Sequence, residues 1–290
     1  MKAPLFGFRG IYANIYNNST TTDPTWRNNT QRAAAQTRCI LASGATVGCF
    51  IESGLNNWNN DIIPKLPNWD FVGGASGRVV AWDTTVWTYE THLVLPMESL
   101  VSEGPPATWN PNGKDIVLCK LRYEGNAANY VWFVAAHHSP YVEPIRYEER
   151  MRQSVQLVAA IKDLGTDRWI AYSDVNEYKN RVLNGPSSIE YMESQGWIDQ
   201  YMEPGMQLAN AGYDSLQSWV PPRKTVPGPM MIDFIFTQGS NKANPIKALQ
   251  HVRGEQIMHT WAGYVSDVDD VNTLVPSDHN WHSLTTMVLR

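Results

Sequence analysis

Apolar runs of strand length, separated by polar stretches rich in Gly, Pro, Asn and Thr, recur along most of the chain. The clearest run covers residues 169–173, which follow a turn-like segment at 165–167 and then give way to polar residues. Short apolar runs bounded in this way are typical of buried β-strands. The same pattern predicts strands at about 4–15, 46–52, 69–73, 78–83, 85–89, 91–95, 115–123, 129–137, 231–237, 248–253 and 282–289.

Helical spacing is confined to a few segments. Apolar residues recur every three to four positions between Pro144 and Leu164, which predicts an amphipathic helix. A second helix is expected from about residue 26 or 30 to residue 43, and a third near 187–195. Many strands with few helices favour an α/β (α+β) fold, a two-sheet β-sandwich flanked by helices. Because no stretch has the composition of an interdomain linker, we expect residues 1–290 to form a single domain.

The charge balance limits the classes of partner. The 290 residues carry 23 Lys and Arg against 28 Asp and Glu, a formal net charge of -5. The strongly basic composition of a non-catalytic nucleic-acid-binding protein is therefore missing. The acidic charge balance does not argue strongly against a metal-dependent enzyme, because a bound cation supplies positive charge for a phosphate.

The cysteines and the N-terminal sequence bear on the compartment. The three cysteines, Cys39, Cys49 and Cys119, are an odd number at no metal-binding spacing, which favours free thiols. The N-terminal residues lack the apolar core of a secretory signal, and no apolar run has membrane-spanning length. We expect a soluble, cytoplasmic protein without a membrane span, with a mature secreted form as the alternative.

Polar side chains stand where several predicted strands end. They are two amides, three carboxylates and histidines, namely Asn14, Glu52, His137 or His138, Asp174 with Asn176, and Asp278 with His279. A fourth carboxylate, Asp233, lies inside a further predicted strand. Carboxylates and amides without cysteine ligands favour a hard cation such as Mg²⁺ or Mn²⁺. The histidines add groups that exchange a proton near neutral pH. Together these groups suit phosphoester hydrolysis, which needs an activated water and compensation of negative charge.

In this respect the chain resembles the endonuclease/exonuclease/phosphatase superfamily, which includes deoxyribonucleases, abasic-site endonucleases, neutral sphingomyelinases and inositol polyphosphate 5-phosphatases. The resemblance spans residues 4–289 and implies the four-layer, deoxyribonuclease-like sandwich with its active site at one edge of the sheets. It consists of six short motifs in the family's order, which are Asn14-Ile15, Glu52, His138, Asp174-x-Asn176, Ile232-Asp233 and Ser277-Asp278-His279.

The resemblance also implies a metal site and a phosphate site. Glu52 would ligate Mg²⁺ or Mn²⁺, with Asn14 and Asp278 close to the ion. The phosphate of the substrate would lie against Asn14, Asn176 and His138. Both sets belong to the predicted strand ends.

Catalytic roles follow from the same resemblance. Asp174 would orient or deprotonate the attacking water, while Asn176 would hold a phosphate oxygen. His279, paired with Asp233, and His138 would be the imidazoles that contact the phosphate or transfer a proton.

The adjacent histidines need a choice. Side chains alternate between the two faces of a strand, so only one of His137 and His138 is expected to enter the site. The following Ser139-Pro140 resembles the deoxyribonuclease pattern, and this favours His138 over His137.

Three departures from the family pattern indicate a divergent member. Some deoxyribonucleases have an additional glutamate where this chain has residues 74–78, which contain no carboxylate. Met231 replaces an arginine that is frequent before the Ile-Asp motif, and Ser173 replaces the usual glycine before Asp174.

The sequence thus predicts a divalent-metal-dependent phosphoesterase that cleaves a phosphodiester, with nucleic acid as the favoured substrate and a nuclease as the favoured activity. The first alternative is a phosphomonoesterase or a sphingomyelinase-like phospholipase. An alternative of another class is a catalytically inactive binding module on the same fold.

Overall fold

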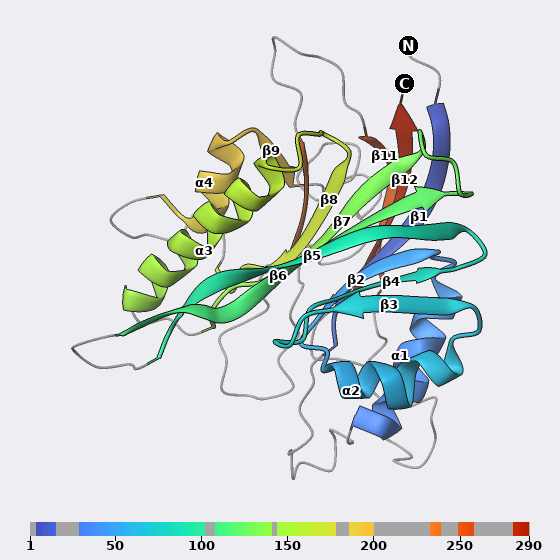
Figure 1. The fold of residues 1–290 in the computed structure, drawn as a ribbon, viewed down its shortest axis with the longest axis horizontal. Coiled ribbons are helices and arrows are strands. Elements are labelled where there is room, and N and C mark those ends of the chain that lie inside the picture. The colour runs from blue at the N-terminus through green and yellow to red at the C-terminus, as the bar shows by residue number, and fades with distance from the viewer. Residues whose placement is uncertain are drawn as a thin grey trace.

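Two six-stranded β-sheets form the centre of the molecule (Figure 1). The computed structural model describes residues 4–15, 29–101, 108–140, 144–177, 186–199, 233–238, 249–257 and 281–289. Helices lie against the outer face of each sheet. The helix-flanked sandwich predicted from the strand pattern is confirmed.

The first sheet, sheet A, contains both ends of the described chain. Its central strands β1 and β2 are parallel, whereas the other neighbours are antiparallel. The parallel pair brings the residues that follow β1 and β2 to the same edge of the sheet. The strand order is β11 (Leu249–Ile257), β12 (Trp281–Leu289), β1 (Pro4–Asn14), β2 (Val47–Ile51), β4 (Val79–Asp83) and β3 (Trp69–Gly73).

The second sheet, sheet B, has the same design. Its central strands β7 and β8 are parallel and are flanked by antiparallel neighbours. The strand order is β5 (Trp87–Leu100), β6 (Trp109–Tyr123), β7 (Tyr130–His137), β8 (Trp169–Asp174), β10 (Asp233–Gln238) and β9 (Trp197–Asp199). Each sheet therefore contributes one pair of parallel strand ends.

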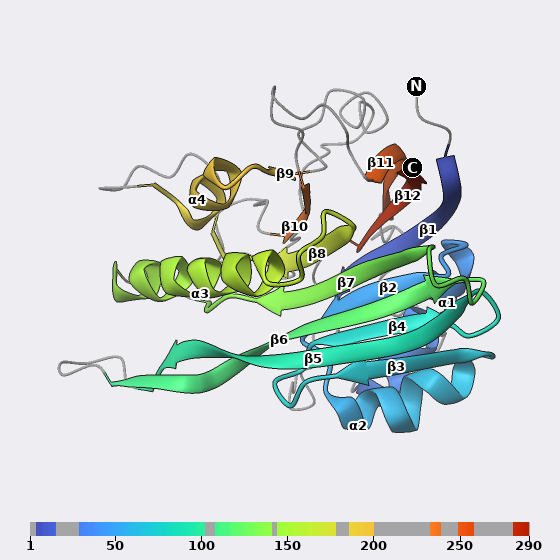
Figure 2. The ribbon, with the colours of Figure 1, turned by 45° about the horizontal axis from the view of Figure 1, so that its top comes forward.

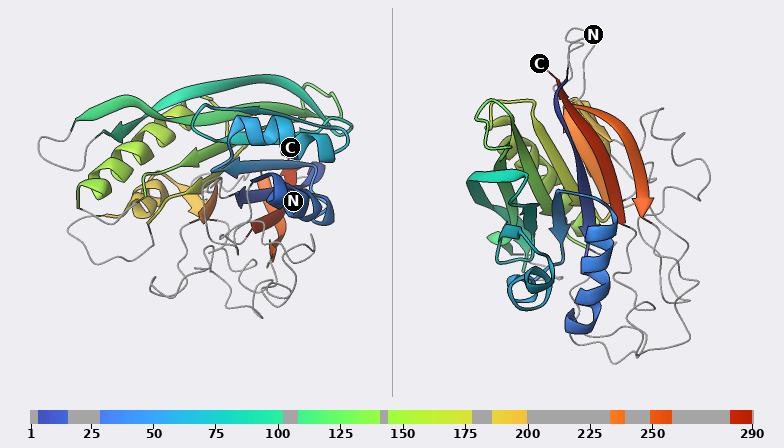
Figure 3. Two further views of the ribbon diagram at one scale, coloured as in Figure 1. Left: turned by 90° about the horizontal axis from the view of Figure 1, so that it is seen from below. Right: turned by 90° about the vertical axis from the view of Figure 1, so that its right-hand side faces the viewer.

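The sheets pack face to face, and Figure 3 (right) shows them as adjacent layers. The core between them is rich in aromatic rings: Phe133 lies with its ring centroid 5.6 Å from that of Phe8 and 5.4 Å from that of Trp87. Edge-to-face contacts of this kind add stability beyond the buried apolar area. This core fixes the spacing of the two sheets and of the strand ends at their edges.

Helices cover the outer faces, as Figures 1 and 2 show. Helix α1 (Asn29–Ala42) packs on sheet A, and α3 (Pro144–Lys162) and α4 (Ser188–Ser194) pack on sheet B. Short turns, α2 (Leu55–Asn57), η1 (Trp58–Ile62) and η2 (Ile63–Lys65), follow β2. Among the described residues, no helix combines the length and apolar character needed to cross a membrane.

The largest difference from the predicted elements is the β5–β6 hairpin. The two strands expected at 85–89 and 91–95 are one strand, β5, with register shifts between Tyr89 and Thr91 and between Met97 and Ser99. The Gly-, Pro- and Asn-rich composition of residues 102–114 predicts a loop, but the chain is strand from Trp109 onward. A short strand at 197–199 was not expected. The sequence also predicts an aromatic, Pro-rich loop at 213–229 and an acidic loop at 265–276, and both lie outside the described residues.

Candidate active site

Polar side chains from both sheets meet at one edge of the sandwich. Asn14 ends β1, and its backbone is in register with Ile51, the residue before Glu52. In sheet B, His137 at the end of β7 is in register with Asp174 at the end of β8. Because both pairs of strands are parallel, their polar ends gather instead of lying at opposite edges.

Asn14 joins the two sheets. Its side-chain Nδ2 lies 3.0 Å from Oε1 of Glu52 and 3.3 Å from Oδ2 of Asp174. Asn14 and Asp174 are almost fully buried, whereas the side chain of Glu52 keeps 31% of its exposure. The amide therefore holds together two carboxylates that would otherwise repel each other.

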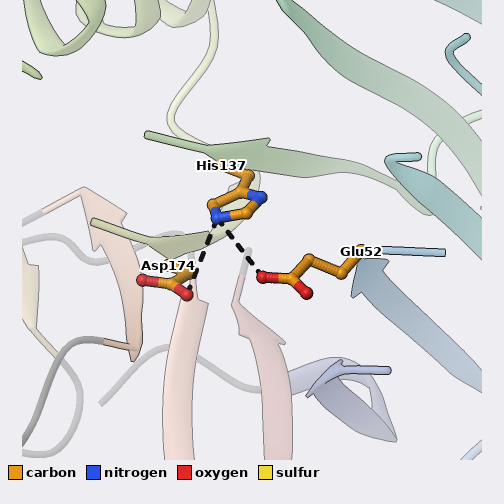
Figure 4. Close-up of side chains that lie close together, drawn as sticks. All are labelled: Glu52, His137 and Asp174. Atoms are coloured by element: carbon orange, nitrogen blue, oxygen red, sulfur yellow. Dashed lines mark ion pairs between the residues drawn. The ribbon is translucent and has the colours of Figure 1, made fainter. Parts of the chain in front are cut away.

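His137 completes the cluster. Its Nε2 atom lies 3.6 Å from Oε1 of Glu52 and 3.8 Å from Oδ2 of Asp174. Figure 4 shows the three side chains pointing toward one another from β7, β8 and the end of β2. The side-chain Nδ2 of Asn176 lies 3.0 Å from the same Nε2 atom. Four predicted strand ends thus form one polar site.

Two of these residues have left-handed backbone conformations, with φ of 50° at Glu52 and 53° at Asn176. Asparagine tolerates this region, and the backbone N–H of Asn176 donates to Oδ1 of Asp174 at 2.8 Å. Glutamate adopts it at a cost, and such strain is concentrated at functional sites. The conformation turns each side chain away from the path of its strand.

Only one of the adjacent histidines faces this cluster, as strand alternation requires. It is His137, so the preference for His138 is wrong. His138 is fully buried on the opposite face, where its ring nitrogens lie 2.9 Å from Oγ of Ser173 and 2.9 Å from Oγ of Ser154. Register and alternation explain the result: His137 pairs with Asp174, and His138 follows it with its side chain on the face of Ala136 and Ser173.

The environment of His138 keeps its imidazole neutral. Burial is the main cause that lowers its pKa to about 3, and Lys114, Arg150 and Arg78 lower it further. A neutral ring can accept one hydrogen bond and donate the other, which suits its two serine partners. His138 is therefore a hydrogen-bonded bridge between β8 and α3.

Asp233 begins β10 directly opposite Asp174 and is fully buried. Its Oδ1 atom accepts a hydrogen bond of 2.8 Å from the hydroxyl of Tyr172. The predicted partners Asp278 and His279 lie outside the described residues, so the pairing of His279 with Asp233 stays a prediction.

The group of Glu52, His137 and Asp174 is suited to a metal ion. Each residue offers one ligand atom, and these atoms lie within 4.8 Å of one another. Two carboxylates and a nearby amide are hard oxygen donors of the kind that Mg²⁺ and Mn²⁺ prefer, and an imidazole is compatible with Mn²⁺. The donor set therefore fits the cation expected from the sequence.

Two cations lie next to this site that no sequence motif indicated. The guanidinium of Arg78 donates to the carbonyl oxygen of His137 at 2.8 Å, and Nζ of Lys114 donates to that of His138 at 3.0 Å. Burial lowers the pKa of Arg78 to about 10 and, together with Arg78, that of Lys114 to about 7. In the sequence, residues 74–78 differ from the family pattern only by a missing carboxylate, which does not point to Arg78. Lys114 belongs to residues 102–114, whose composition predicts a loop.

No protein-family model matches the sequence, and no curated protein matches it significantly. Solved structures do match. An endonuclease/exonuclease/phosphatase family protein from Bacteroides thetaiotaomicron is 14% identical, with a TM-score of 0.68 over 99% of each chain.

Two further matches have a named activity or a bound ligand. A mannosyl-6-phosphatase from Bacteroides thetaiotaomicron is 14% identical, with a TM-score of 0.68 over 96% of this chain and 99% of that chain. Danio rerio TDP2, in complex with a single-stranded DNA product, is 13% identical, with a TM-score of 0.61 over 97% and 98% of the two chains. The chain therefore has the fold of the endonuclease/exonuclease/phosphatase proteins.

Proposed function

We propose that the protein is a divergent endonuclease/exonuclease/phosphatase superfamily member that hydrolyses phosphoesters with the help of a divalent metal ion. The observation that carries this proposal is the convergence of Glu52, His137 and Asp174 with the amides Asn14 and Asn176. Acidic, imidazole and amide groups in one place are what the chemistry needs: charge compensation, proton transfer and orientation of the phosphate. An ordinary surface gains nothing from burying two carboxylates together.

Glu52 is the principal ligand for Mg²⁺ or Mn²⁺ in this proposal, with Asn14 beside it and Asp278 as a further predicted ligand. When bound, the ion neutralises charge on the phosphate and activates oxygen ligands. Glu52 suits this role because its side chain is the most exposed of the three in the cluster and points toward the two others.

Asp174 is the proposed base that orients the attacking water and takes its proton. The residue is held rigidly, since its Oδ1 accepts from the backbone of Asn176 and its Oδ2 lies near Asn14. Asn176 and His137 would contact the phosphate oxygens, with His137 replacing His138 in this role. His279, held by Asp233, is the predicted second imidazole.

We further propose a phosphodiester in nucleic acid as the substrate and a nuclease as the activity. The single-stranded DNA product bound to TDP2 supports this choice by analogy of fold. Because the chain has a net charge of -5, we expect such binding to be assisted by the positive charge of the metal ion. A phosphomonoester is the second candidate, supported by that acidic balance and by the phosphatase of the same fold.

A side-by-side assay tests the proposal. Single-stranded and duplex DNA, RNA, sugar phosphates, inositol phosphates and sphingomyelin are incubated with the protein and Mg²⁺ or Mn²⁺, with and without EDTA. We expect DNA or RNA to be cleaved and EDTA to abolish cleavage. Glu52→Gln and His137→Ala should lower kcat by about 10²- to 10⁴-fold, the loss typical of a missing catalytic group.

The matched control is Glu90→Gln, which removes an exposed carboxylate that pairs with Lys120 at 2.7 Å. This variant should keep wild-type turnover. Cleavage of sugar phosphates alone would select the phosphomonoesterase. No hydrolysis of any substrate, or hydrolysis that survives EDTA, would overturn the proposed reaction and revive the inactive binding module.

A further inference from the structure

The turn between β3 and β4, residues 74–78, contacts the catalytic strand ends of both sheets. On the side of sheet B, Nη2 of Arg78 donates to the carbonyl oxygen of His137 at 2.8 Å. On the side of sheet A, the carbonyl oxygen of Gly77 accepts a hydrogen bond of 2.9 Å from the N–H of Ser53, the residue after Glu52. The turn therefore spans the two strand ends that carry Glu52 and His137.

The backbone of the turn is shaped for this contact. Gly77 has a φ of +82°, a conformation that residues with side chains rarely adopt. A Cβ atom at this position would also lie 3.1 Å from the backbone nitrogen of Ser53. Both the backbone conformation and the close approach to the end of β2 therefore favour glycine at position 77.

A buried carboxylate fixes the turn on its other side. Oδ2 of Asp115, on β6, accepts from the backbone N–H of Ser76 at 3.0 Å, and Oδ1 lies 3.9 Å from Nε of Arg78. Gly74 leaves room for this carboxylate, because a Cβ atom there would lie 2.3 Å from Oδ2. The guanidinium also donates to the carbonyl oxygen of Ser76. Arg78 is thus held in one orientation by its own turn and by sheet B.

Arg78 is only 2% exposed, which is unusual for an arginine. Burial of its charge is costly, and a surface ion pair with Asp115 would avoid that cost. The buried position gains a hydrogen bond to the peptide of His137 and places positive charge behind Glu52 and Asp174, which both favour its charged form.

We propose that Arg78 is a positioning residue that sets the separation and orientation of Glu52 and His137. This inference rests on the proposed function, since it assigns the turn to the same metal-binding site. Metal ligands and catalytic groups require placement within about 0.5 Å, and residues that orient them typically contribute 10- to 100-fold to metal affinity or activity. Lys114 assists by holding the next carbonyl oxygen, that of His138.

The experiment compares Arg78→Ala, Arg78→Lys and wild type by Mn²⁺ titration calorimetry and by steady-state kinetics. We expect Arg78→Ala to raise the Kd for Mn²⁺ and to lower kcat, each by about 10- to 100-fold, with KM changed less. Arg78→Lys keeps the charge but loses the planar pair of donors, so its defects should be intermediate. Added guanidinium ion should restore part of the activity of Arg78→Ala.

The matched control is Arg146→Ala. Arg146 is also buried, and its Nη1 lies 2.8 Å from Oε2 of Glu149 on α3. This variant loses a buried ion pair and should unfold more easily, yet keep the wild-type Kd and kcat below its Tm. If Arg78→Ala does not fold, Gly77→Ala provides a second test. It perturbs the same turn between β3 and β4 at its contact with Ser53, next to Glu52, and should weaken Mn²⁺ binding.

The two proposals fail in different ways. A wild-type protein that binds Mn²⁺ but hydrolyses no substrate defeats the proposed function, while calorimetry still decides the role of Arg78. If the folded Arg78 and Gly77 variants keep the wild-type Kd and kcat, Arg78 has only a structural role and does not position the metal site. A wild-type protein that binds no Mn²⁺ would overturn both proposals.

Discussion

At the scale of single residues, one step along β7 separates a reactive position from a structural one. His137 and His138 have the same chemistry, yet the first faces two carboxylates and the second faces two serines. Alternation along a strand is visible in the sequence, but the choice of face depends on the register between β7 and β8. The sequence therefore predicted one inward histidine, but the motif after the strand favoured His138, the wrong one of the two.

The buried, neutral state of His138 leads to a pH-dependent stability. Its pKa is lowered to about 3 in the folded protein, whereas an unfolded chain titrates near about 6.5. Between these values the unfolded state binds the extra proton, so the free energy of unfolding falls as the pH decreases. The expected slope is about 1.4 kcal/mol per pH unit, and the full stability is present above the unfolded pKa.

His138→Gln should remove this slope, because glutamine can bridge two hydroxyls without titrating. Urea unfolding of the metal-free proteins at several pH values measures the effect. The difference in stability between wild type and variant should shrink as the pH falls from about 6.5 toward about 4. Parallel curves for the two proteins would mean that His138 does not carry the effect.

At the scale of elements, apolar periodicity located most strands and helices to within a few residues, including α3 at 144–162 and β7 at 130–137. It failed in the β5–β6 hairpin, where the Gly-, Pro- and Asn-rich composition of residues 102–114 suggested a loop. Pro96 in β5 and Pro111 in β6 are tolerated because β5 is an edge strand and because the pairing of β6 with β7 begins only at Val117. Pairing partners, rather than local composition, decided the outcome.

The packing of α3 on sheet B gives a prediction for stability. Leu157 is fully buried in the cluster between the helix and the sheet, whereas Val155 on the same helix is 44% exposed. Leu157→Ala should lower the free energy of unfolding by about 2 to 5 kcal/mol, and Val155→Ala by less than about 0.5 kcal/mol. Denaturant titration measures both, and equal losses would contradict the assigned helix face.

At the scale of the whole molecule, the site is formed by residues from both sheets. Asn14 and Glu52 come from sheet A, and His137, Asp174 and Asn176 come from sheet B. The order of these residues could be read from the sequence, and so could their position at strand ends. Their meeting depends on the aromatic core that sets how the sheets face each other, which no local pattern encodes. The same holds for Arg78, which reaches His137 across the sandwich.

A metal site formed by two sheets couples metal binding to global stability. An ion held by Glu52 from one sheet and by Asp174 or His137 from the other binds the folded state and loses its site when the sheets separate. At an Mn²⁺ concentration 100 times its Kd, the free energy of unfolding should rise by about 2.7 kcal/mol. Thermal and urea unfolding, with and without EDTA, measure this change.

Glu52→Gln should lose most of the stabilisation, whereas Glu90→Gln should keep it, because the exposed Glu90 pairs with Lys120 on sheet B. An equal rise in the free energy of unfolding of the two variants would show that Mn²⁺ binds elsewhere and not between the two sheets.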